Sequence, residues 1–523
     1  LLTHLHSSLV KVMLHQMERV LRAFSTKNVD YITFITSLLV VVGIASSILY
    51  DAETAQTLIG ESYDNIVGVF GPVYLILTIF SFFFLIYICI SSHGKYRLGG
   101  QDQKAEFSYF SWIGMLFCSG IGGGLVYWSG VEWAYYVDIP PFGIEPGSNE
   151  AFALATAYGL FHWGISAWSI YGIPAIALSI AFYKYKLSTL RLSSSLRGLG
   201  VKNIEETFGG RLIDLIFVIA TVGAAGGTIG SYIPMLSSGF SDIFSIEKGF
   251  SLDLQVLALC VGLFGFSVYS GLTKGIKRLS DLNLLLAILF LIIILFIGPG
   301  LDILRSSIDG LFYTVRFFWD MSTLGILEQS DFADEWTIFY WAWWVAFGPL
   351  VALFIARISK GRTLRELILG MLIFGSLGTW LFYMILGGYS MSLEQTGVFG
   401  VMNSLNESGH ADTAISIVHT MPFDNFMLLL FCVITIIFVT TSYDSMSFVI
   451  AYHVQKNSSE QRDPDKELRL FWAVVLGILP AALVIYSDHS VAMDLILITS
   501  LPLLFIYPLM ALAIFKDLHQ EQK

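Results

Sequence analysis

Four of the twelve tryptophans in this chain lie in one apolar segment, residues 336–362. Three of them, Trp341, Trp343 and Trp344, fall within a single helical turn or so of one another. The faces of aromatic rings attract positive charge, so such a group is suited to bind an organic cation. The same segment carries Gly348-Pro349, which predicts a break in the helix beside the tryptophans.

A second aromatic group lies on the segment FHWGISAWSIYG, residues 161–172. At about 100° per residue, Trp163, Trp168 and Tyr171 fall within an arc of about 140° on one helix. With Trp344 and Phe347 they could form an aromatic box, each ring contributing about 0.5–2 kcal/mol toward a desolvated cation. Packing or an aromatic belt at the membrane surface is the alternative for any single ring. Tryptophans clustered at mid-span in two helices favour the box.

Two further segments could present oxygen atoms or backbone groups to a ligand. The sequence GIGGG, residues 120–124, predicts an unwound segment, although small residues also allow close helix packing. The segment FVTTSYDS, residues 438–445, offers hydroxyl and carbonyl oxygens, which suit a hard cation. Its hydroxyls could equally bond to the carbonyls of their own helix. Both interpretations stay open at this point.

Three ionisable residues near membrane depth are also candidates. Glu132 and Asp444 are carboxylates, for which function is the default hypothesis within a membrane. A structural role at a helix break or near the membrane surface explains them equally well. His162, beside Trp163, could relay protons, although a packing role is the commoner one for such a histidine.

The composition identifies the kind of element that must position these groups. The chain has 523 residues, of which 55% are hydrophobic and only 13% charged, and its mean hydropathy is +0.71. A soluble domain carries about twice that charged fraction. Apolar runs of about twenty residues favour membrane-spanning helices over a β-barrel. All four cysteines lie in apolar segments, so disulfides, zinc sites and cysteine catalysis are not expected.

The apolar segments predict twelve spans with both termini in the cytoplasm. Of the 29 lysines and arginines, only Lys248, Arg305 and Arg316 lie in loops assigned to the outside, as the positive-inside rule requires. The first 28 residues are expected to form an amphipathic helix on the membrane surface. The predicted spans are 31–50, 69–91, 108–134, 151–182, 212–238, 252–271, 282–298, 336–357, 364–388, 425–453, 469–487 and 491–515.

The two expected interruptions, at GIGGG and at Gly348-Pro349, lie five spans apart and therefore in helices of opposite orientation. Interrupted helices at matching positions in two oppositely oriented units indicate an inverted-repeat transporter. The expected parts are a cytoplasmic amphipathic segment (1–28), two additional helices (29–92), the first repeat (108–298), an outer surface helix and loop (299–335), the second repeat (336–515) and a short cytoplasmic tail (516–523).

At these residues the chain resembles the betaine/carnitine/choline transporter family, from about residue 30 to residue 515. The resemblance rests on FYWAWWVAFGPLVALFIARISKGRTLRE, FHWGISAWSIYG, GIGGG followed by LVYWSGVEW, and FVTTSYDS. It implies an all-α polytopic membrane protein with twelve transmembrane helices. These would form a LeuT-like 5+5 inverted repeat with two additional N-terminal helices. It also implies a secondary transporter of the cell inner membrane, not an enzyme, and many members are trimers.

The resemblance also implies roles for particular residues. The expected substrate-binding residues are Trp163, Trp168, Tyr171, Trp343, Trp344 and Phe347, with the backbone near Gly122 meeting the substrate carboxylate. Phe347 stands where glycine-betaine carriers have a further tryptophan. Sodium, the expected coupling ion, would be bound by backbone carbonyls of Cys118, Ile121 and Phe438 and by the hydroxyls of Thr441 and Ser442.

Departures from the family pattern refine the expected function. Gly124 stands where proton-coupled choline carriers place an aspartate, and residues 282–297 carry no charge where sodium-independent exchangers place an arginine. A second sodium site aligns with Thr221, Ala225 and Leu350, which puts that site in doubt. The family's usual Glu-Pro is Glu132-Trp133 here, for which the sequence offers no physical account.

The resulting hypothesis is a sodium-driven importer of a small quaternary-ammonium or sulfonium zwitterion, such as glycine betaine or dimethylsulfoniopropionate. The alternative is a sodium-independent substrate:product exchanger of carnitine or betaine type. A homotrimer is expected, and anionic lipid is expected near the basic run Arg357–Arg365, whereas nucleic acid is not.

Overall fold

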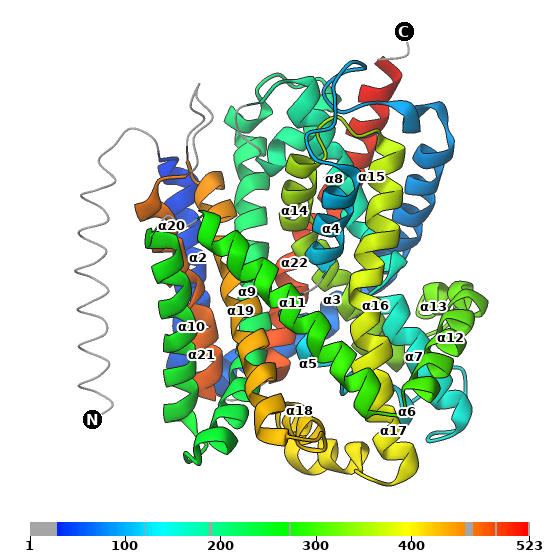
Figure 1. Ribbon diagram of the computed structural model, residues 1–523. Coiled ribbons are helices and arrows are strands. Elements are labelled where there is room, and N and C mark those ends of the chain that lie inside the picture. Colours follow the sequence, from blue (N-terminus) through cyan, green and yellow to red (C-terminus); the bar gives the residue numbers. More distant parts are fainter. Residues whose placement is uncertain are drawn as a thin grey trace.

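The computed structural model describes residues 29–120, 122–187, 191–270, 273–455, 464–486 and 489–520. These residues form an all-helical bundle with irregular loops and two isolated backbone bridges, so the all-α prediction is confirmed (Figure 1). Among them, eleven helical stretches are long and apolar enough to cross a membrane. The predicted surface helix at residues 1–28 and the last three residues of the predicted tail lie outside the described residues.

Most predicted spans correspond to single long helices. These are α2 (Tyr31–Tyr50), α3 (Ala52–Ile90), α9 (Phe208–Phe244), α10 (Phe250–Ser270), α11 (Thr273–Ile297), α14 (Ile338–Ile358), α19 (Asp424–His453) and α22 (His489–Gln520). Others consist of consecutive shorter helices: α7 (Asn149–His162) with α8 (Ile165–Lys184), α15 (Leu364–Gly370) with α16 (Ser376–Phe382) and α17 (Gly388–Thr396), and α20 (Lys466–Leu476) with α21 (Ile478–Tyr486).

The third predicted span is interrupted, as the glycines predict. It consists of α4 (Tyr109–Gly120), α5 (Gly123–Trp128) and α6 (Glu132–Asp138), each too short to cross a membrane alone. Between α4 and α5, Gly122 has extended backbone, with φ −148° and ψ 178°. This interruption explains why eleven long apolar stretches are found where the sequence predicts twelve spans.

The eighth predicted span is continuous, so the break expected at Gly348-Pro349 is wrong. Pro349 has no N–H and cannot bond to the carbonyl of Val345 one turn earlier. The hydroxyl of Tyr507, on α22, donates to that carbonyl over 3.1 Å instead. A Cβ at Gly348 would overlap the Tyr507 hydroxyl, so glycine is needed for this approach. The pair therefore forms a docking point for α22 rather than an unwound segment.

The fourth span contains a break that the sequence analysis did not predict. Trp163 and Gly164 separate α7 from α8. The indole nitrogen of Trp380, on α16, donates to the carbonyl of Leu160 over 2.8 Å. Any side chain at Gly164 would overlap both groups, so the absence of a Cβ lets Trp380 reach the freed carbonyl. With one predicted break missing and another present, the LeuT-like inverted repeat and the residue limits of the two repeats stay predictions.

Loops that the charge pattern assigns to one side share one end of the bundle, the top in Figure 1. There the backbone amide of Asp30 donates to Val454 and Lys184 forms an ion pair with Asp517 at 3.1 Å. At the opposite end Lys248 pairs with Asp412, on α18 (Val401–His419). The structure thus agrees with the predicted alternation of the loops.

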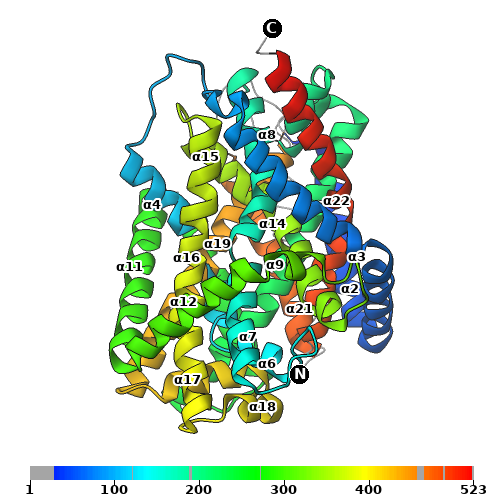
Figure 2. The same ribbon diagram turned by 90° about the vertical axis from the view of Figure 1, so that its right-hand side faces the viewer.

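The predicted surface segment forms α12 (Gly300–Arg316) and α13 (Phe318–Thr323). Helix α12 crosses the bundle obliquely beside α7, as Figure 2 shows, and the hydroxyl of Thr314 lies 3.2 Å from the carbonyl of Ala157. The opposite face of α12 is exposed and apolar, with Leu301, Leu304, Ile308, Phe312 and Val315 at its surface.

Candidate functional site

The predicted aromatic residues of the fourth and eighth spans lie in contact at the centre of the bundle. The rings of Trp163 and Trp344 have centroids 4.8 Å apart and meet edge to face at 78°. Tyr171 lies 5.8 Å from Trp344 and 5.4 Å from Trp168, again edge to face. All four side chains are buried. Segments about 180 residues apart in the chain thus build one aromatic cluster.

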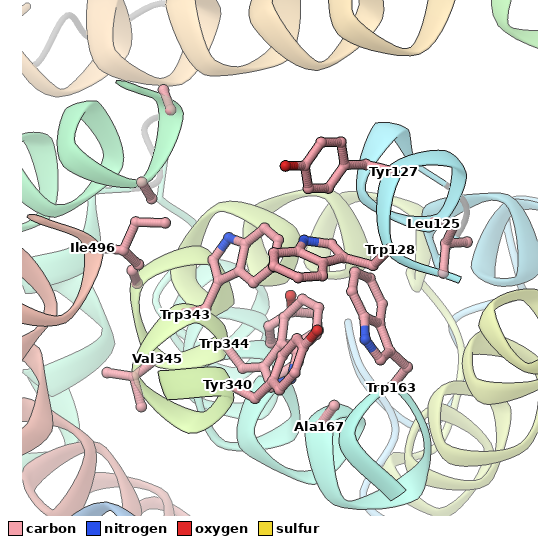
Figure 3. Close-up of a cluster of buried hydrophobic side chains, with 14 of the residues drawn as sticks. Leu125, Tyr127, Trp128, Trp163, Ala167, Tyr340, Trp343, Trp344, Val345 and Ile496 are labelled. Carbon is pink, nitrogen blue, oxygen red and sulfur yellow. The ribbon is translucent and has the colours of Figure 1, made fainter. Parts of the chain in front are cut away.

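Trp343 and Phe347 extend this cluster along α14 (Figure 3 shows Trp343 with Trp163 and Trp344). The rings of Trp343 and Trp344 are parallel within 1°, with centroids 5.4 Å apart. Phe347 is only partly buried and lies 6.4 Å from Trp343. The structure therefore brings together all six predicted aromatic residues, while their role in binding a substrate stays a prediction.

Several aromatic residues that contact this cluster were missed by the sequence analysis, including Tyr340 and Trp128. Tyr340 lies nearly parallel to Trp344 at 6.0 Å, and Trp128 approaches Trp343 at 6.5 Å (Figure 3). Tyr340 precedes Trp344 by four residues on α14, a spacing that places both on one face of a helix. That spacing is a signal which could have identified Tyr340.

The break between α7 and α8 supplies backbone groups to the cluster. The last carbonyls of a helix have no partner within it and must be satisfied by other groups. The indole nitrogen of Trp344 donates to the carbonyl of His162 over 2.8 Å, and the hydroxyl of Thr379 donates to the carbonyl of Trp163. The first bond fixes the ring of Trp344 against the end of α7, and the second ties the backbone of Trp163 to α16.

The glycine segment packs directly against the same rings. A Cβ on Gly120 would lie 2.9 Å from Trp168, and one on Gly124 would lie 2.8 Å from Trp163. At Gly122, in contrast, a Cβ would meet no atom within 4 Å. The unwound backbone therefore lies beside the cluster with open space next to Gly122, where the substrate carboxylate is predicted to bind.

The predicted sodium ligands are divided between α4 and α19. Cys118 lies near the end of α4 and is partly buried, whereas Ile121 lies outside the described residues. A Cβ on Gly123 would be 3.7 Å from Phe438, so the start of α5 packs against α19 at this level.

On α19, Thr441 and Ser442 are partly buried. The Thr441 hydroxyl lies 2.9 Å from the carbonyl of Ile437 and 3.1 Å from that of Phe438, which is the alternative interpretation of this motif. Thr221, aligned with the second site, likewise donates within its own helix, to Phe217 over 2.8 Å. Both sodium sites stay predictions.

A buried carboxylate lies behind the aromatic cluster. Glu132 is fully buried and accepts hydrogen bonds from Tyr136 over 2.6 Å, from the Trp163 indole over 3.3 Å, and from the hydroxyls of Tyr340 and Tyr383. Asp444, the other candidate carboxylate, instead pairs with Arg469 at 3.2 Å and so ties α19 to α20.

His162 joins the Glu132 network through one hydroxyl. Its Nδ1 lies 3.0 Å from the Tyr136 hydroxyl and its Nε2 lies 3.1 Å from the Thr337 hydroxyl. The buried histidine is thus satisfied on both ring nitrogens, as the packing interpretation requires.

Residues of three one-turn π-helical segments contact the site. The segments are Ala333–Thr337, Met371–Gly375 and Tyr383–Gly387. Their residues Thr337, Gly375 and Tyr383 contact His162, Trp168 and Glu132, respectively. Such segments occur often at functional sites because they shift the register of a helix by one residue.

Long apolar helices that enclose a buried aromatic cluster beside an unwound helix define a polytopic membrane protein with a central site for a small molecule. The sequence profile described as BCCT, betaine/carnitine/choline family transporter, matches residues 32–523, and the chain belongs to that family. The resemblance seen in the sequence is thereby confirmed. The protein is an integral membrane transporter and not an enzyme.

Individual relatives are similar over most of their length. The uncharacterized transporter YeaV of Escherichia coli is 32% identical over 425 residues, which cover 81% of this chain and 88% of the relative. The carnitine transporter of Acinetobacter baumannii is 31% identical, with 94% of this chain and 89% of the relative covered. The glycine betaine transporter OpuD of Bacillus subtilis is 32% identical, with 94% and 93% covered.

Proposed function

We propose that the protein imports a small zwitterion with a quaternary-ammonium or sulfonium group, similar to glycine betaine, and that a sodium gradient drives the import. The observation that carries this proposal is the contact of Trp163, Tyr171 and Trp344 from two distant segments. The faces of such rings attract the positive charge of a quaternary ammonium group. The substrate carboxylate would meet the backbone beside Gly122.

Sodium coupling is supported by the uncharged stretch at residues 282–297 of α11, a helix that packs against α19. The side-chain amide of Asn283 donates to the carbonyl of Ile434 over 3.2 Å, and residues 282–297 contain no charged side chain. A fixed cation in this helix could replace sodium, and none is present in that range. Sodium at Cys118, Ile121, Phe438, Thr441 and Ser442 would link the unwound third span to α19 and close the substrate site.

Uptake of radiolabelled glycine betaine into proteoliposomes tests the proposed function. Inward sodium and potassium gradients are compared, with empty and with betaine-preloaded vesicles. Uptake into empty vesicles that requires sodium is expected. If no quaternary-ammonium or sulfonium compound is taken up under any of these conditions, the proposed substrate class is wrong.

Removing hydroxyl ligands should weaken sodium activation. In Thr441→Ala and Ser442→Ala variants, the sodium concentration for half-maximal uptake should rise roughly tenfold, since each loses one oxygen ligand to a charged ion. Ser445→Ala is the matched control, because Ser445 is exposed one turn further along α19 and donates to the Thr441 carbonyl over 3.0 Å. If all three variants need the same sodium concentration for half-maximal uptake as the wild type, Thr441 and Ser442 are not sodium ligands.

A sodium-independent exchanger is the second candidate function. It is favoured by the Thr441 hydroxyl, which bonds to a carbonyl of its own helix. An exchanger would take up substrate only into preloaded vesicles, with or without sodium. That result in the uptake experiment would replace the symport proposal.

We also propose that the protein resides in the cytoplasmic (inner) membrane with both termini in the cytoplasm, and that the two repeats rock about the site to alternate access. The charge pattern of the loops supports this orientation. In the basic run, Arg362 stacks on Trp112 at 4.8 Å and Arg365 donates to the carbonyl of Cys89 over 2.6 Å. Contact of this run with anionic lipid stays a prediction.

A homotrimer is proposed with the exposed apolar face of α12 as its contact. Because this face lies outside the bundle, replacing Ile308 and Phe312 together with aspartate should convert trimers into monomers. The mass of the detergent-solubilised complex measures the change. Asp309→Ala, an exposed change on another face of α12, should leave the mass unaltered. A wild-type protein that is monomeric in mild detergent and in native membranes would contradict the proposal.

A further inference from the structure

Glu132 occupies a position that the proposed transport function does not use. It begins α6, the last helix of the interrupted third span, and none of its surface is exposed. Its four hydrogen-bond donors come from three other parts of the bundle as well as from α6 itself. A carboxylate at this depth is costly to bury, so its retention calls for a reason beyond packing.

The hydrogen-bond partners of Glu132 suit an ionised carboxylate. Each of them can donate, namely the phenols of Tyr136, Tyr340 and Tyr383 and the indole of Trp163, which can only donate. A carboxylate accepts at up to about four lone-pair sites, whereas a protonated carboxyl group must also donate. None of these partners is charged. Among the described residues, no lysine or arginine forms an ion pair with Glu132.

Two of the four donors are rings of the aromatic cluster. Trp163 donates its indole N–H to Glu132 and meets Trp344 at 4.8 Å with its ring. Tyr340 donates its hydroxyl to the same carboxylate oxygen and lies parallel to Trp344 at 6.0 Å. A ring that donates a hydrogen bond to an anion gains electron density, and its face then attracts a cation more strongly.

We propose that Glu132 is a specificity-determining residue that makes the site select a cationic head group over a neutral group of the same shape. It acts in two ways, as a fixed negative charge behind the rings and as the acceptor that polarises Trp163 and Tyr340. The quaternary ammonium of the substrate is the counter-ion that the described residues do not provide. This inference rests on the proposed substrate class.

The test uses two ligands that differ only in the charged centre. Glycine betaine and 3,3-dimethylbutanoate have the same shape and the same carboxylate, but the second carries carbon in place of the ammonium nitrogen. Displacement of radiolabelled glycine betaine from the purified full-length protein gives an inhibition constant for each. The ratio of the two constants isolates the interaction with the ammonium charge, because all other contacts are shared.

In Glu132→Gln the preference for glycine betaine over 3,3-dimethylbutanoate should fall about tenfold, because the ammonium loses its attraction to a charge buried behind the rings. Glu132→Asp keeps the charge and should retain most of the preference. The matched control is Glu205→Gln, the same change at a buried carboxylate that pairs with Arg197 at 2.8 Å, away from the site. There the ratio should equal that of the wild type.

An equal loss of affinity for both ligands in Glu132→Gln would overturn the proposal, because a purely structural residue would act in that way. If thermal unfolding shows that Glu132→Gln is not folded, the ratio of the two inhibition constants is measured for Tyr340→Phe instead. That variant removes one polarised donor and should lower the ratio by a smaller factor, whereas an unchanged ratio would overturn the proposal. A wild-type protein that binds no quaternary-ammonium or sulfonium compound would instead contradict the proposed function.

Discussion

Replacing Trp344 with leucine is expected to raise the KM for glycine betaine uptake by about thirtyfold. Trp344 lies at the centre of the cluster, in contact with Trp163 and Tyr171, and its indole nitrogen is fixed by the carbonyl of His162. Leucine keeps apolar bulk but has no ring face, so a desolvated cation loses an interaction of up to about 2 kcal/mol. Initial rates of uptake into proteoliposomes at varied betaine concentration measure the change.

Two further variants distinguish the loss of the aromatic face from a non-specific effect of substitution on transport. Trp344→Phe keeps an aromatic face and should give a KM between those of wild type and the leucine variant. Trp319→Leu removes an exposed tryptophan on α13, outside the cluster, and should leave the KM unchanged. A leucine variant of Trp344 with the wild-type KM would show that the aromatic cluster does not bind the substrate cation.

Gly120→Ala is expected to reduce uptake at least tenfold, because the added methyl group has no room. A Cβ at Gly120 would lie 2.6 Å from the carbonyl oxygen of Gly375 and 2.9 Å from the ring of Trp168. Backbone of the neighbouring span cannot retreat as a flexible side chain can, so either α4 or Trp168 must move. Uptake and its KM, normalised to the amount of protein in the vesicles, measure the effect.

Gly114→Ala provides the matched control on the same helix. Gly114 lies on α4, and a Cβ there would meet no atom within 4 Å. Alanine also favours a helix by about 1 kcal/mol over glycine, so this variant should fold and transport as well as the wild type. If both alanine variants transport equally well, the close approach between α4 and Trp168 has no part in the transport cycle.

Much of this protein is determined by local sequence. The apolar runs predict the long helices because a membrane helix needs about twenty apolar residues and bonds its own backbone internally. The glycines of residues 120–124 predict the interruption between α4 and α5, since such a run has little preference for helix. The spacing of Trp168 and Tyr171 likewise places them on one side of α8, whereas Trp163 lies in the break before that helix.

Other features were decided by contacts between distant segments. Gly348-Pro349 is a break by local rules, yet α14 stays continuous because Tyr507 bonds to the carbonyl that the proline leaves free. The break at Gly164 exists because Trp380 bonds to the carbonyl of Leu160. Neither partner can be identified from nearby residues.

In the candidate site, too, some features follow from local sequence and others only from contacts between distant segments. Which residue types bind a cation follows from sequence, because aromatic rings and hydroxyl oxygens are recognisable by kind. Whether Glu132 is satisfied, and by which groups, follows only from the meeting of Tyr136, Trp163, Tyr340 and Tyr383 around it. Helix formation depends on residues within a few positions of each other, whereas the desolvation and pairing of a buried charge depend on every segment packed against it.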